Sequence, residues 1–262
     1  MDNKPLVSVI IPTFNSANLI SKAINSALQQ DYHNYEIIIV DDCSTDNTSQ
    51  VVSDYCLKDS RVIYFQLDCN SGPAAARNKA LENAHGDLIA FLDADDEWLP
   101  GKLSAQVLLM QEHPQIDVLF TNVITIDEKN KISTNYSETN KIFSRHLLSE
   151  PLAGHTELFQ LHGEVKRQLY RGNFICISSV LIKTDKIRLV NGFDNSCFGT
   201  EDLDIWVRLA EICSFYYFHK VTVHYYWMPS SISRVGEKRL KELLRYHKAA
   251  LTSPDYSDLK DI

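Results

Sequence analysis

The sequence predicts an α/β fold with a mainly parallel, Rossmann-like sheet and helices on both faces. Short apolar runs of strand length alternate with stretches of helical periodicity along the first half of the chain. These strand runs have almost no polar side, which is typical of strands covered by helices on both faces. Each run also stops abruptly at polar residues. In such sheets, ligands bind outside the carboxyl ends of the strands, so these polar ends are candidate functional positions.

The first half of the chain is expected to alternate four strands with three helices. Apolar residues from Leu19 to Leu28 share one helical face. Thr45 or Asp46 caps the second helix. Gly72-Pro73 opens the third, because a proline in the first helical turn has no hydrogen bond to lose. The strands are expected over residues 7–11, 36–40, 62–67 and 88–92.

The second half is less regular. Residues 127–171 show no clear hydrophobic period, so we expect a loop or short helices over the site there. Helices are expected over residues 100–112, 201–213 and 236–251, and strands over residues 118–126, 174–182 and 214–227.

Composition narrows the class of protein. The chain has 262 residues and a net charge of −8, which argues against a nucleic-acid partner. Its six cysteines show no CxxC pair, which indicates reduced thiols in a cytosolic protein. No signal peptide and no apolar run of about 20 residues is visible. We therefore expect a soluble, cytoplasmic protein, with peripheral contact at the inner face of the membrane left open.

The run Asp93-Ala94-Asp95-Asp96 directly follows the apolar strand 88–92. Crowded carboxylates raise one another's pKa unless a cation offsets their charge. An oxygen-only site with few protein ligands suits Mg²⁺ or Mn²⁺ that also carries substrate phosphates. Taken alone, the motif fits an Asp-rich turn equally well. Three other strand ends are also polar, and their coincidence favours a site: Pro12-Thr13-Phe14-Asn15, Asp41-Asp42 and Asp68-Cys69-Asn70.

Five ordered motifs resemble the family 2 glycosyltransferases. The resemblance covers roughly residues 5–125 and 172–212 and implies a GT-A fold, a nucleotide-sugar donor, a divalent metal and inversion at the anomeric carbon. The motifs are Val9 to Asn15, Val40 to Asp46, Asn70 to Asn78, Asp93 to Asp95, and Gly192-Phe193-Asp194 followed by Glu201 to Trp206.

The resemblance assigns the donor nucleotide to the first three motifs. Pro12, Thr13, Asn15 and Asp42 would hold the base and ribose, with Asp42 accepting a hydrogen bond from a base N–H. Asp42 could instead cap the next helix. Arg77 would lie near the base or diphosphate, because a guanidinium forks onto phosphate oxygens. The alternative for Arg77 is a solvated helix residue.

For the metal, the resemblance implies that Asp93 contacts ribose or metal and that Asp95 is the metal ligand. The metal would neutralise the departing diphosphate. Asp96 is expected to be a cap or a solvated neighbour that does not face the chemistry. His224 is a candidate further ligand, although a lone His among aromatic residues is more often packed in a strand.

The acceptor hydroxyl needs a base, because it is a poor nucleophile until its proton is removed. By resemblance, Asp202 is this base and Glu201 orients substrate. The alternative is that both acids merely favour a helix N-terminus through the helix dipole. Asp204 is expected to be solvated or structural.

Departures from the family refine the reading. Cys43 stands where the family often has Gly, and Tyr225-Tyr226 where many relatives carry Tyr-Arg. The Gln-x-x-Arg-Trp signature of processive synthases is absent, which favours addition of a single sugar. The acceptor would be a saccharide, such as a surface glycan, or its lipid-linked precursor.

The resulting prediction is a metal-dependent, inverting glycosyltransferase with a UDP-sugar donor. Residues 1–126 would form the nucleotide-sugar half, 127–235 the acceptor-side half, and 236–262 a C-terminal helix and tail. A nucleotidyltransferase would generally carry a Gly-rich basic loop after the first strand, and an oxidoreductase would show GxGxxG; neither is present. A non-catalytic nucleotide-sugar binder is disfavoured by the intact acids. Oligomeric state has no signature here.

Overall fold

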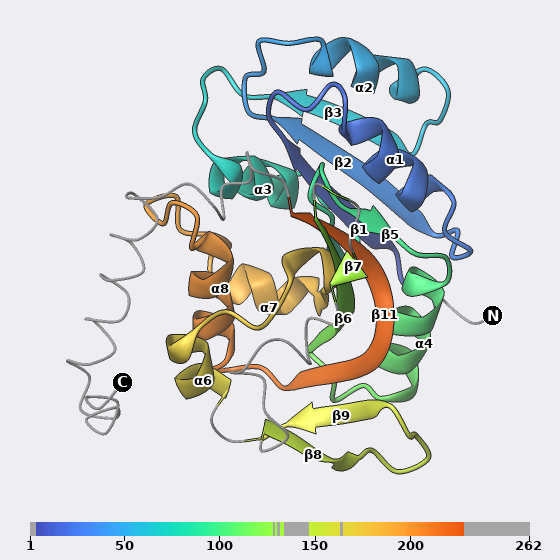
Figure 1. Ribbon diagram of the computed structural model, residues 1–262, viewed down its shortest axis with the longest axis vertical. Coiled ribbons are helices and arrows are strands. Elements are labelled where there is room, and N and C mark those ends of the chain that lie inside the picture. Colours follow the sequence, from blue (N-terminus) through green and yellow to red (C-terminus); the bar gives the residue numbers. More distant parts are fainter. Residues whose placement is uncertain (1–3, 128, 130–131, 134–146, 163–164, 228–262) are drawn as a thin grey trace.

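A computed structural model describes residues 4–127, 129, 132–133, 147–162 and 165–227 of the chain. Within these residues, eleven strands form one sheet with helices on both of its faces (Figure 1). The main strand order is β3-β2-β1-β4-β10-β6-β11-β9-β8, with β5 paired to β11 and β7 paired to β6. The α/β fold expected from the sequence is confirmed.

The first four strands form the parallel half that the sequence predicts. Each runs parallel to its neighbours, and β1 lies between β2 and β4. Their carboxyl ends consequently lie along one edge of the sheet. The strands are Val7–Thr13 (β1), Tyr35–Asp41 (β2), Val62–Gln66 (β3) and Leu88–Phe91 (β4).

The other half of the sheet is mixed. β10 (Leu181–Lys183) runs antiparallel to both β4 and β6. β6 (Val118–Asp127) and β11 (Phe215–Trp227) pair in parallel, and both strands are confirmed where the sequence predicts them. β5 (Glu97–Trp98) and β7 (Ile132–Ser133) are two-residue additions to these strands.

The strand predicted over residues 174–182 is wrong for most of its length. Ile177–Ser179 form a short 3₁₀ turn (η2), and only the end of the segment enters β10. The Ser179 hydroxyl donates to the carbonyl of Cys176 at 2.7 Å. Side-chain bonds of this kind compete with strand pairing. An apolar run without periodicity does not distinguish the two outcomes.

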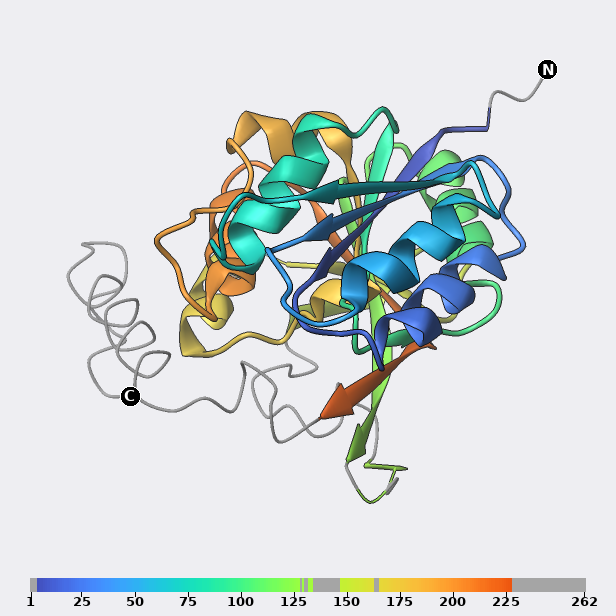
Figure 2. The same ribbon diagram turned by 90° about the horizontal axis from the view of Figure 1, so that it is seen from above.

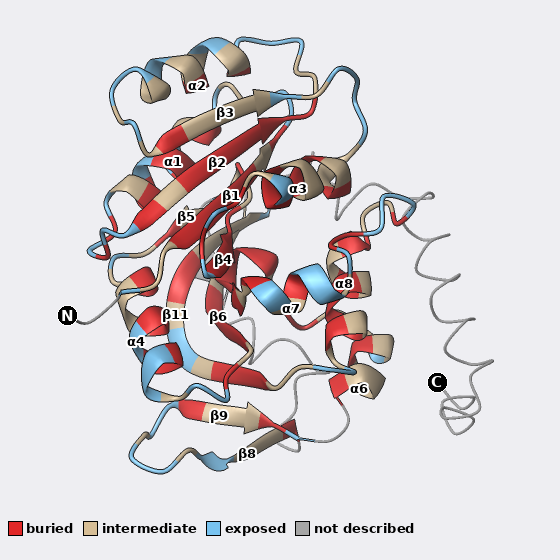
Figure 3. Cartoon of the chain, turned by 180° about the vertical axis from the view of Figure 1, so that it is seen from behind, coloured by how far each residue is buried: buried red, intermediate tan, exposed pale blue. Residues whose placement is uncertain are grey.

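Two apolar layers cover the two faces of the sheet. Val9 and Ile11 of β1 pack with α1, α2 and α4, whereas Ile10 packs with α3, α6, α7 and α8. This alternation is the two-residue period of a strand. Figure 2 shows the helices on either side of the strands, and Figure 3 shows the buried strands between them. The helices are Ile20–Leu28 (α1), Thr48–Cys56 (α2), Pro73–Glu82 (α3), Lys102–Glu112 (α4), Val165–Arg171 (α6), Thr184–Leu189 (α7) and Glu201–Leu209 (α8).

Part of the segment 127–171 differs from expectation. Leu148–Pro151 (β8) and Leu158–Leu161 (β9) form an antiparallel hairpin at the edge of the sheet, beside β11. β9 pairs with residues 216–218, near the start of β11. The hairpin was not expected, because its two strands are too short for a period to show in the sequence.

Some expectations lie outside the described residues. The predicted helix 236–251 and the tail to residue 262 are among them. No helix in the described segments is long and apolar enough to cross a membrane. The predicted boundary at residue 126 falls one residue before the end of strand β6, inside one continuous sheet. The division into donor and acceptor halves therefore stays a prediction.

Candidate active site

Three carboxylates meet directly after β4. One oxygen each from Asp93, Asp95 and Asp96 lies within 4.8 Å of the others. Asp96 N donates to the carbonyl of Asp93 at 3.0 Å, which closes a turn and turns these side chains toward one another. The Asp-rich turn and the cluster of possible metal ligands are therefore one structure. Oxygen ligands of this kind suit Mg²⁺ or Mn²⁺.

Asp96 is the buried member of this cluster, with 1% of its surface exposed. Its carboxylate accepts hydrogen bonds from the Ser178 hydroxyl at 2.5 Å and from Tyr226 N at 3.2 Å. The same Ser178 oxygen accepts a bond from Asp93 N at 3.1 Å. The expectation of a solvated Asp96 is wrong, because η2 and β11 cover it. That it does not face the chemistry stays a prediction.

The cluster is electrostatically crowded. Burial, together with the negative charge of Asp93, raises the pKa of Asp95 to about 6. Burial and the charges of Asp95 and Asp93 raise the pKa of Asp96 well above its usual value. A bound cation would offset this repulsion and favour the ionised carboxylates. The donor set and its charge therefore fit a hard divalent cation.

Arg77 on α3 joins the aspartate cluster to α8. Its guanidinium contacts Asp93 Oδ1 at 2.7 Å through Nη2 and Glu201 Oε1 at 2.9 Å through Nη1. The side chain is 4% exposed, so the alternative of a solvated helix residue is wrong. The fork expected to bind phosphate is occupied by two carboxylates. Arg77 thus fixes Glu201 beside the predicted metal ligands.

Asp202 lies in the first turn of α8. One of its oxygens accepts a bond from Leu203 N at 2.8 Å, and the other accepts one from Asn173 Nδ2 at 2.6 Å. Burial, followed by the charge of Glu201, raises the pKa of Asp202 to about 7, although Arg77 opposes this shift. A carboxylate with a pKa near neutrality can take up a proton during a reaction, as a general base must. Both acids also occupy the helix N-terminus, where the dipole favours them.

Asp42 binds the backbone at the N-terminus of α3. Its two oxygens accept the N–H groups of Ser71 at 2.6 Å and Gly72 at 2.8 Å. The alternative that Asp42 caps the next helix, α2, is wrong, because Asp46 accepts the N–H of Thr48 there. A carboxylate oxygen has more than one lone pair, so these bonds leave Asp42 able to accept from a ligand.

The other predicted donor residues gather at the ends of β1 and β2. Pro12 and Thr13 pair with Val40 and Asp41 in register, and the carbonyl of Thr13 accepts the N–H of Asp42 at 2.8 Å. Asn15 lies beyond them, with its side-chain oxygen accepting Thr45 N at 2.8 Å. These contacts bring the first two motifs together.

Two turns at this edge take unusual backbone angles. Asn15 has φ of 48° and Cys43 has φ of 62°, in the left-handed region that favours glycine. The angle at Cys43 explains why glycine is common at this position in the family that the sequence resembles.

Three buried polar atoms at predicted site residues have no hydrogen-bond partner among the described residues. They are Thr13 Oγ1, Arg77 Nε and Glu201 Oε2. Buried polar groups are nearly always satisfied, so an unmet group calls for an explanation. A site that is incomplete without its ligand is one.

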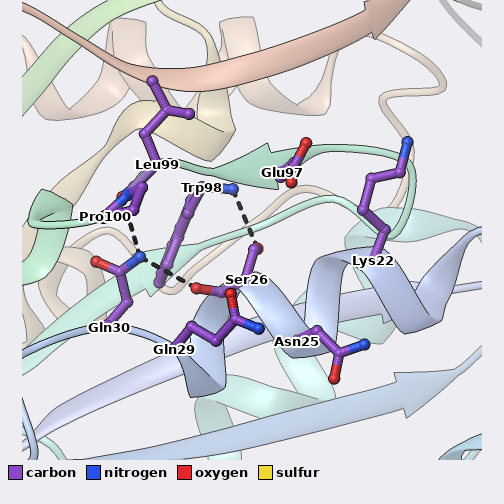
Figure 4. A pocket seen from close by; sticks show the side chains of 9 residues that line it. All are labelled: Lys22, Asn25, Ser26, Gln29, Gln30, Glu97, Trp98, Leu99 and Pro100. Carbon is purple, nitrogen blue, oxygen red and sulfur yellow. Dashed lines mark hydrogen bonds between the residues drawn. The ribbon is translucent and has the colours of Figure 1, made fainter.

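A ligand role for His224 stays a prediction, and the cavity in Figure 4 is separate from the predicted site residues. His224 Nδ1 lies 3.4 Å from Glu97 Oε2, and His224 is not part of the aspartate cluster. The cavity, of about 310 Å³, lies between α1 and residues 97–100, and no predicted site residue lines it (Figure 4). Its Gln30 amide already donates to the carbonyls of Ser26 and Leu99.

Sequence reasoning missed three supporting residues. Asn173 orients Asp202 and Ser178 orients Asp96, as described above. Asn78, which directly follows Arg77, exchanges two hydrogen bonds of 2.8 Å with the backbone of Phe193. Only Asn78 lay inside a recognised motif, so it alone carried a signal that could have found it.

The chain was compared with known proteins. The family described as "Glycosyl transferase family 2" matches residues 8–179. An uncharacterised glycosyltransferase of Rickettsia typhi is 33% identical over 84% of this chain and 63% of its own. TuaG of Bacillus subtilis, named for teichuronic acid biosynthesis, is 49% identical over 42% of this chain and 43% of its own. WcaA of Escherichia coli, named for colanic acid biosynthesis, is 44% identical over 47% of this chain and 44% of its own.

The chain thus spans about half to two thirds of the length of these curated relatives. Among solved structures, Staphylococcus aureus TarS residues 1–349 in complex with UDP match with a TM-score of 0.67 and 23% identity. The match covers 95% of this chain and 66% of that one. TarS 1–349 in complex with UDP-GlcNAc matches with a TM-score of 0.68 and 22% identity, over 95% of this chain and 67% of that one. These likenesses confirm the GT-A fold, and the family match identifies the chain as a member of glycosyl transferase family 2.

Proposed function

We propose that this chain transfers one sugar from a nucleotide-diphosphate sugar, most favourably a UDP-sugar, to an acceptor hydroxyl with inversion. The observation that carries the proposal is the Arg77 bridge. It holds Asp93 and Glu201 together and so sets Asp202 next to a cluster of possible metal ligands. A donor site and a base on facing elements are what a direct displacement needs.

Within this proposal, Asp202 removes the proton of the acceptor hydroxyl as that oxygen attacks the anomeric carbon. Asn173 holds one carboxylate oxygen of Asp202 and the N–H of Leu203 holds the other, so the base is oriented before substrate arrives. Glu201 orients substrate through Oε2, which has no partner among the described residues. The attack and the departure of the nucleotide occur in one step, without a covalent enzyme intermediate.

Asp93 and Asp95 would hold Mn²⁺ or Mg²⁺ together with the donor diphosphate. When bound, such a cation supplies positive charge to the departing diphosphate. Asp42, Pro12, Thr13 and Asn15 would receive the nucleoside. The UDP and UDP-GlcNAc complexes of TarS, which has the same fold, favour a uridine nucleotide here.

The acceptor is proposed to be a saccharide or lipid-linked saccharide of a surface polysaccharide. The names of TuaG and WcaA, which refer to teichuronic and colanic acid biosynthesis, support this choice. A cytoplasmic setting is proposed because the six cysteines include no CxxC pair, and thiols stay reduced in the cytosol.

A nucleotide-sugar screen tests the proposal. Binding and slow hydrolysis of UDP-, GDP-, dTDP- and CMP-sugars are measured with Mn²⁺, with Mg²⁺ and with chelator. The expected result is metal-dependent binding of one nucleotide class, with UDP-sugars binding most tightly. Absence of binding at millimolar concentration with metal present would overturn it. Binding without hydrolysis or transfer to any acceptor would favour the non-catalytic binder instead.

A further inference from the structure

A second group of possible metal ligands lies apart from the aspartates. His113, directly after α4, and His155, in the turn between β8 and β9, bring their Nε2 atoms to 2.8 Å. The carboxylate of Glu112 completes the group, with one ligand atom of each residue within 4.8 Å of the others. The rings meet edge to face, with centroids 4.9 Å apart. Two segments 42 positions apart in sequence therefore converge on one small volume.

Hydrogen bonds hold the backbone at both histidines. His113 N donates to the carbonyl of Leu109 at 2.9 Å and ends α4, and the carbonyl of His113 accepts Ile116 N at 3.0 Å. His155 N donates to the carbonyl of Leu152 at 2.9 Å, inside a turn closed by Leu152 N and the carbonyl of Leu158 at 2.8 Å. The backbone that carries each imidazole is thus held by local hydrogen bonds.

The short contact between the two nitrogens limits their chemistry. Two Nε2–H groups cannot face each other at this distance, so at least one Nε2 directs a lone pair toward its neighbour. Lone pairs of imidazole nitrogens are ligands that borderline cations such as Zn²⁺ prefer, and two His with one carboxylate is a recurrent zinc ligand set. A tetrahedral zinc at about 2.0–2.1 Å from each nitrogen separates them by roughly 3.3 Å. The rings need to open by only about half an ångström.

We propose that His113, His155 and Glu112 form a zinc site, with water as the fourth ligand, that fastens the β8–β9 hairpin to the end of α4. The site differs in kind from the aspartate cluster, whose all-oxygen ligands suit Mn²⁺ or Mg²⁺. Its role is structural. The hairpin is an edge element whose strand pairing with β11 spans three residues, and a cation at its turn adds an attachment to the end of α4.

Tag-free protein, first treated with chelator, tests this site by calorimetric titration with zinc chloride and by thermal unfolding. We expect one equivalent of Zn²⁺ to bind and, at saturation, to raise the melting temperature by about 5 °C. His155→Ala should abolish the high-affinity equivalent and the rise. Glu112→Gln, an exposed change that leaves folding intact, should weaken zinc binding roughly tenfold or more. His162→Ala, at an exposed histidine next to β9, is the matched control and should behave as the unmodified protein.

The Co²⁺ form supplies a direct readout, since tetrahedral Co²⁺ with nitrogen ligands gives visible absorption bands that His155→Ala should remove. Mn²⁺-dependent binding of a nucleotide sugar should be unchanged in Glu112→Gln, which separates this site from the donor site. Two outcomes would overturn the proposal. One is a zinc response that persists in both His155→Ala and Glu112→Gln. The other is no zinc response at all, which leaves the histidines as a simple hydrogen-bonded pair.

Discussion

Arg77 and Glu201 lie 124 positions apart and form a buried ion pair of 2.9 Å. The arginine also bonds Asp93, so one guanidinium bridges two carboxylates that belong to different halves of the chain. The pair makes α3 and α8 a single unit at the end of the sheet where the polar motifs lie. It is the contact through which the helix that carries the proposed base is held beside the aspartate cluster.

Replacing Arg77 should destabilise the folded protein. Arg77→Met leaves Glu201 buried without its partner, and breaking a buried pair from one side costs about 3–5 kcal/mol of unfolding free energy. The double variant Arg77→Met with Glu201→Gln should recover much of that loss, because the orphaned charge is gone. Urea denaturation of the single and double variants measures both. A loss below about 1 kcal/mol in the single variant would contradict a structural role for the bridge.

Asp202→Asn should separate chemistry from binding. Loss of a general base lowers kcat about 10²–10⁴-fold, whereas donor affinity should stay within about twofold of the unmodified value. Asn keeps the oxygen that accepts Leu203 N, so the helix should remain intact. Asp204→Asn is the control, since Asp204 pairs with Arg208 on the same helix and has no proposed part in transfer. Equal losses in both variants would remove the assignment of Asp202.

Asp95→Asn should act on the donor instead. With one proposed ligand gone, Mn²⁺-dependent affinity for the nucleotide sugar should fall roughly tenfold or more, and metal-independent affinity should not change. Asp96→Asn is the matched comparison, because Asp96 is engaged by Ser178 and Tyr226. Isothermal titration with and without Mn²⁺ tests both. A larger loss in Asp96→Asn would mean that the buried acid is the ligand.

Activity should depend on pH near neutrality. The pKa of Asp202 is raised to about 7 in the folded protein, mainly by burial, so the carboxylate is increasingly protonated below that pH. A general base works only when deprotonated, and therefore kcat/KM should rise tenfold per pH unit below about 7 and level off above it. The measurement is a pH–rate profile from pH 5.5 to 8.5 at saturating metal. A flat profile would be incompatible with this base.

Stability should respond to pH through Lys102, which is fully buried beside Trp98 and donates to Gln106 at 2.6 Å. Burial lowers its pKa from 10.5 to about 7 in the folded state. Between these pH values the unfolded chain binds more protons, so this residue makes stability rise with pH from about 7 upward and contributes no slope below 7. Lys102→Met should flatten the melting temperature between pH 7 and 9.5. Identical pH profiles of the two proteins would refute a buried, neutralised lysine.

The sequence predicted the parallel half of the fold and the polar ends of its strands well. Those features follow from local patterns, since an apolar run of strand length and a helical face lie within a few residues of each other. The rule that parallel strands end at one edge then placed Thr13, Asp42 and Asp93 together without any knowledge of contacts.

The residues that hold the site residues in place could not be predicted from local sequence patterns. Ser178 reaches Asp96 across 82 positions, and Asn173 reaches Asp202 across 29 positions. Arg77 looked like a phosphate ligand because nothing in its own motif reveals the two carboxylates from elsewhere that it bonds. No sequence pattern predicts the hydrogen-bond partners of a serine or an asparagine in an irregular segment. Only packing brings those partners within reach.

The two bonds that Asp42 accepts from Ser71 N and Gly72 N have a consequence for how this chain could diversify. The same aspartate that is proposed to meet the nucleobase also fastens the beginning of α3, and Arg77 follows five positions after Gly72 on that helix. Selection at position 42 is therefore constrained by folding as well as by donor choice. A lineage that changed its nucleotide would need another acceptor for the N–H groups of Ser71 and Gly72 before it could replace Asp42, and it would otherwise keep the rest of α3 unchanged.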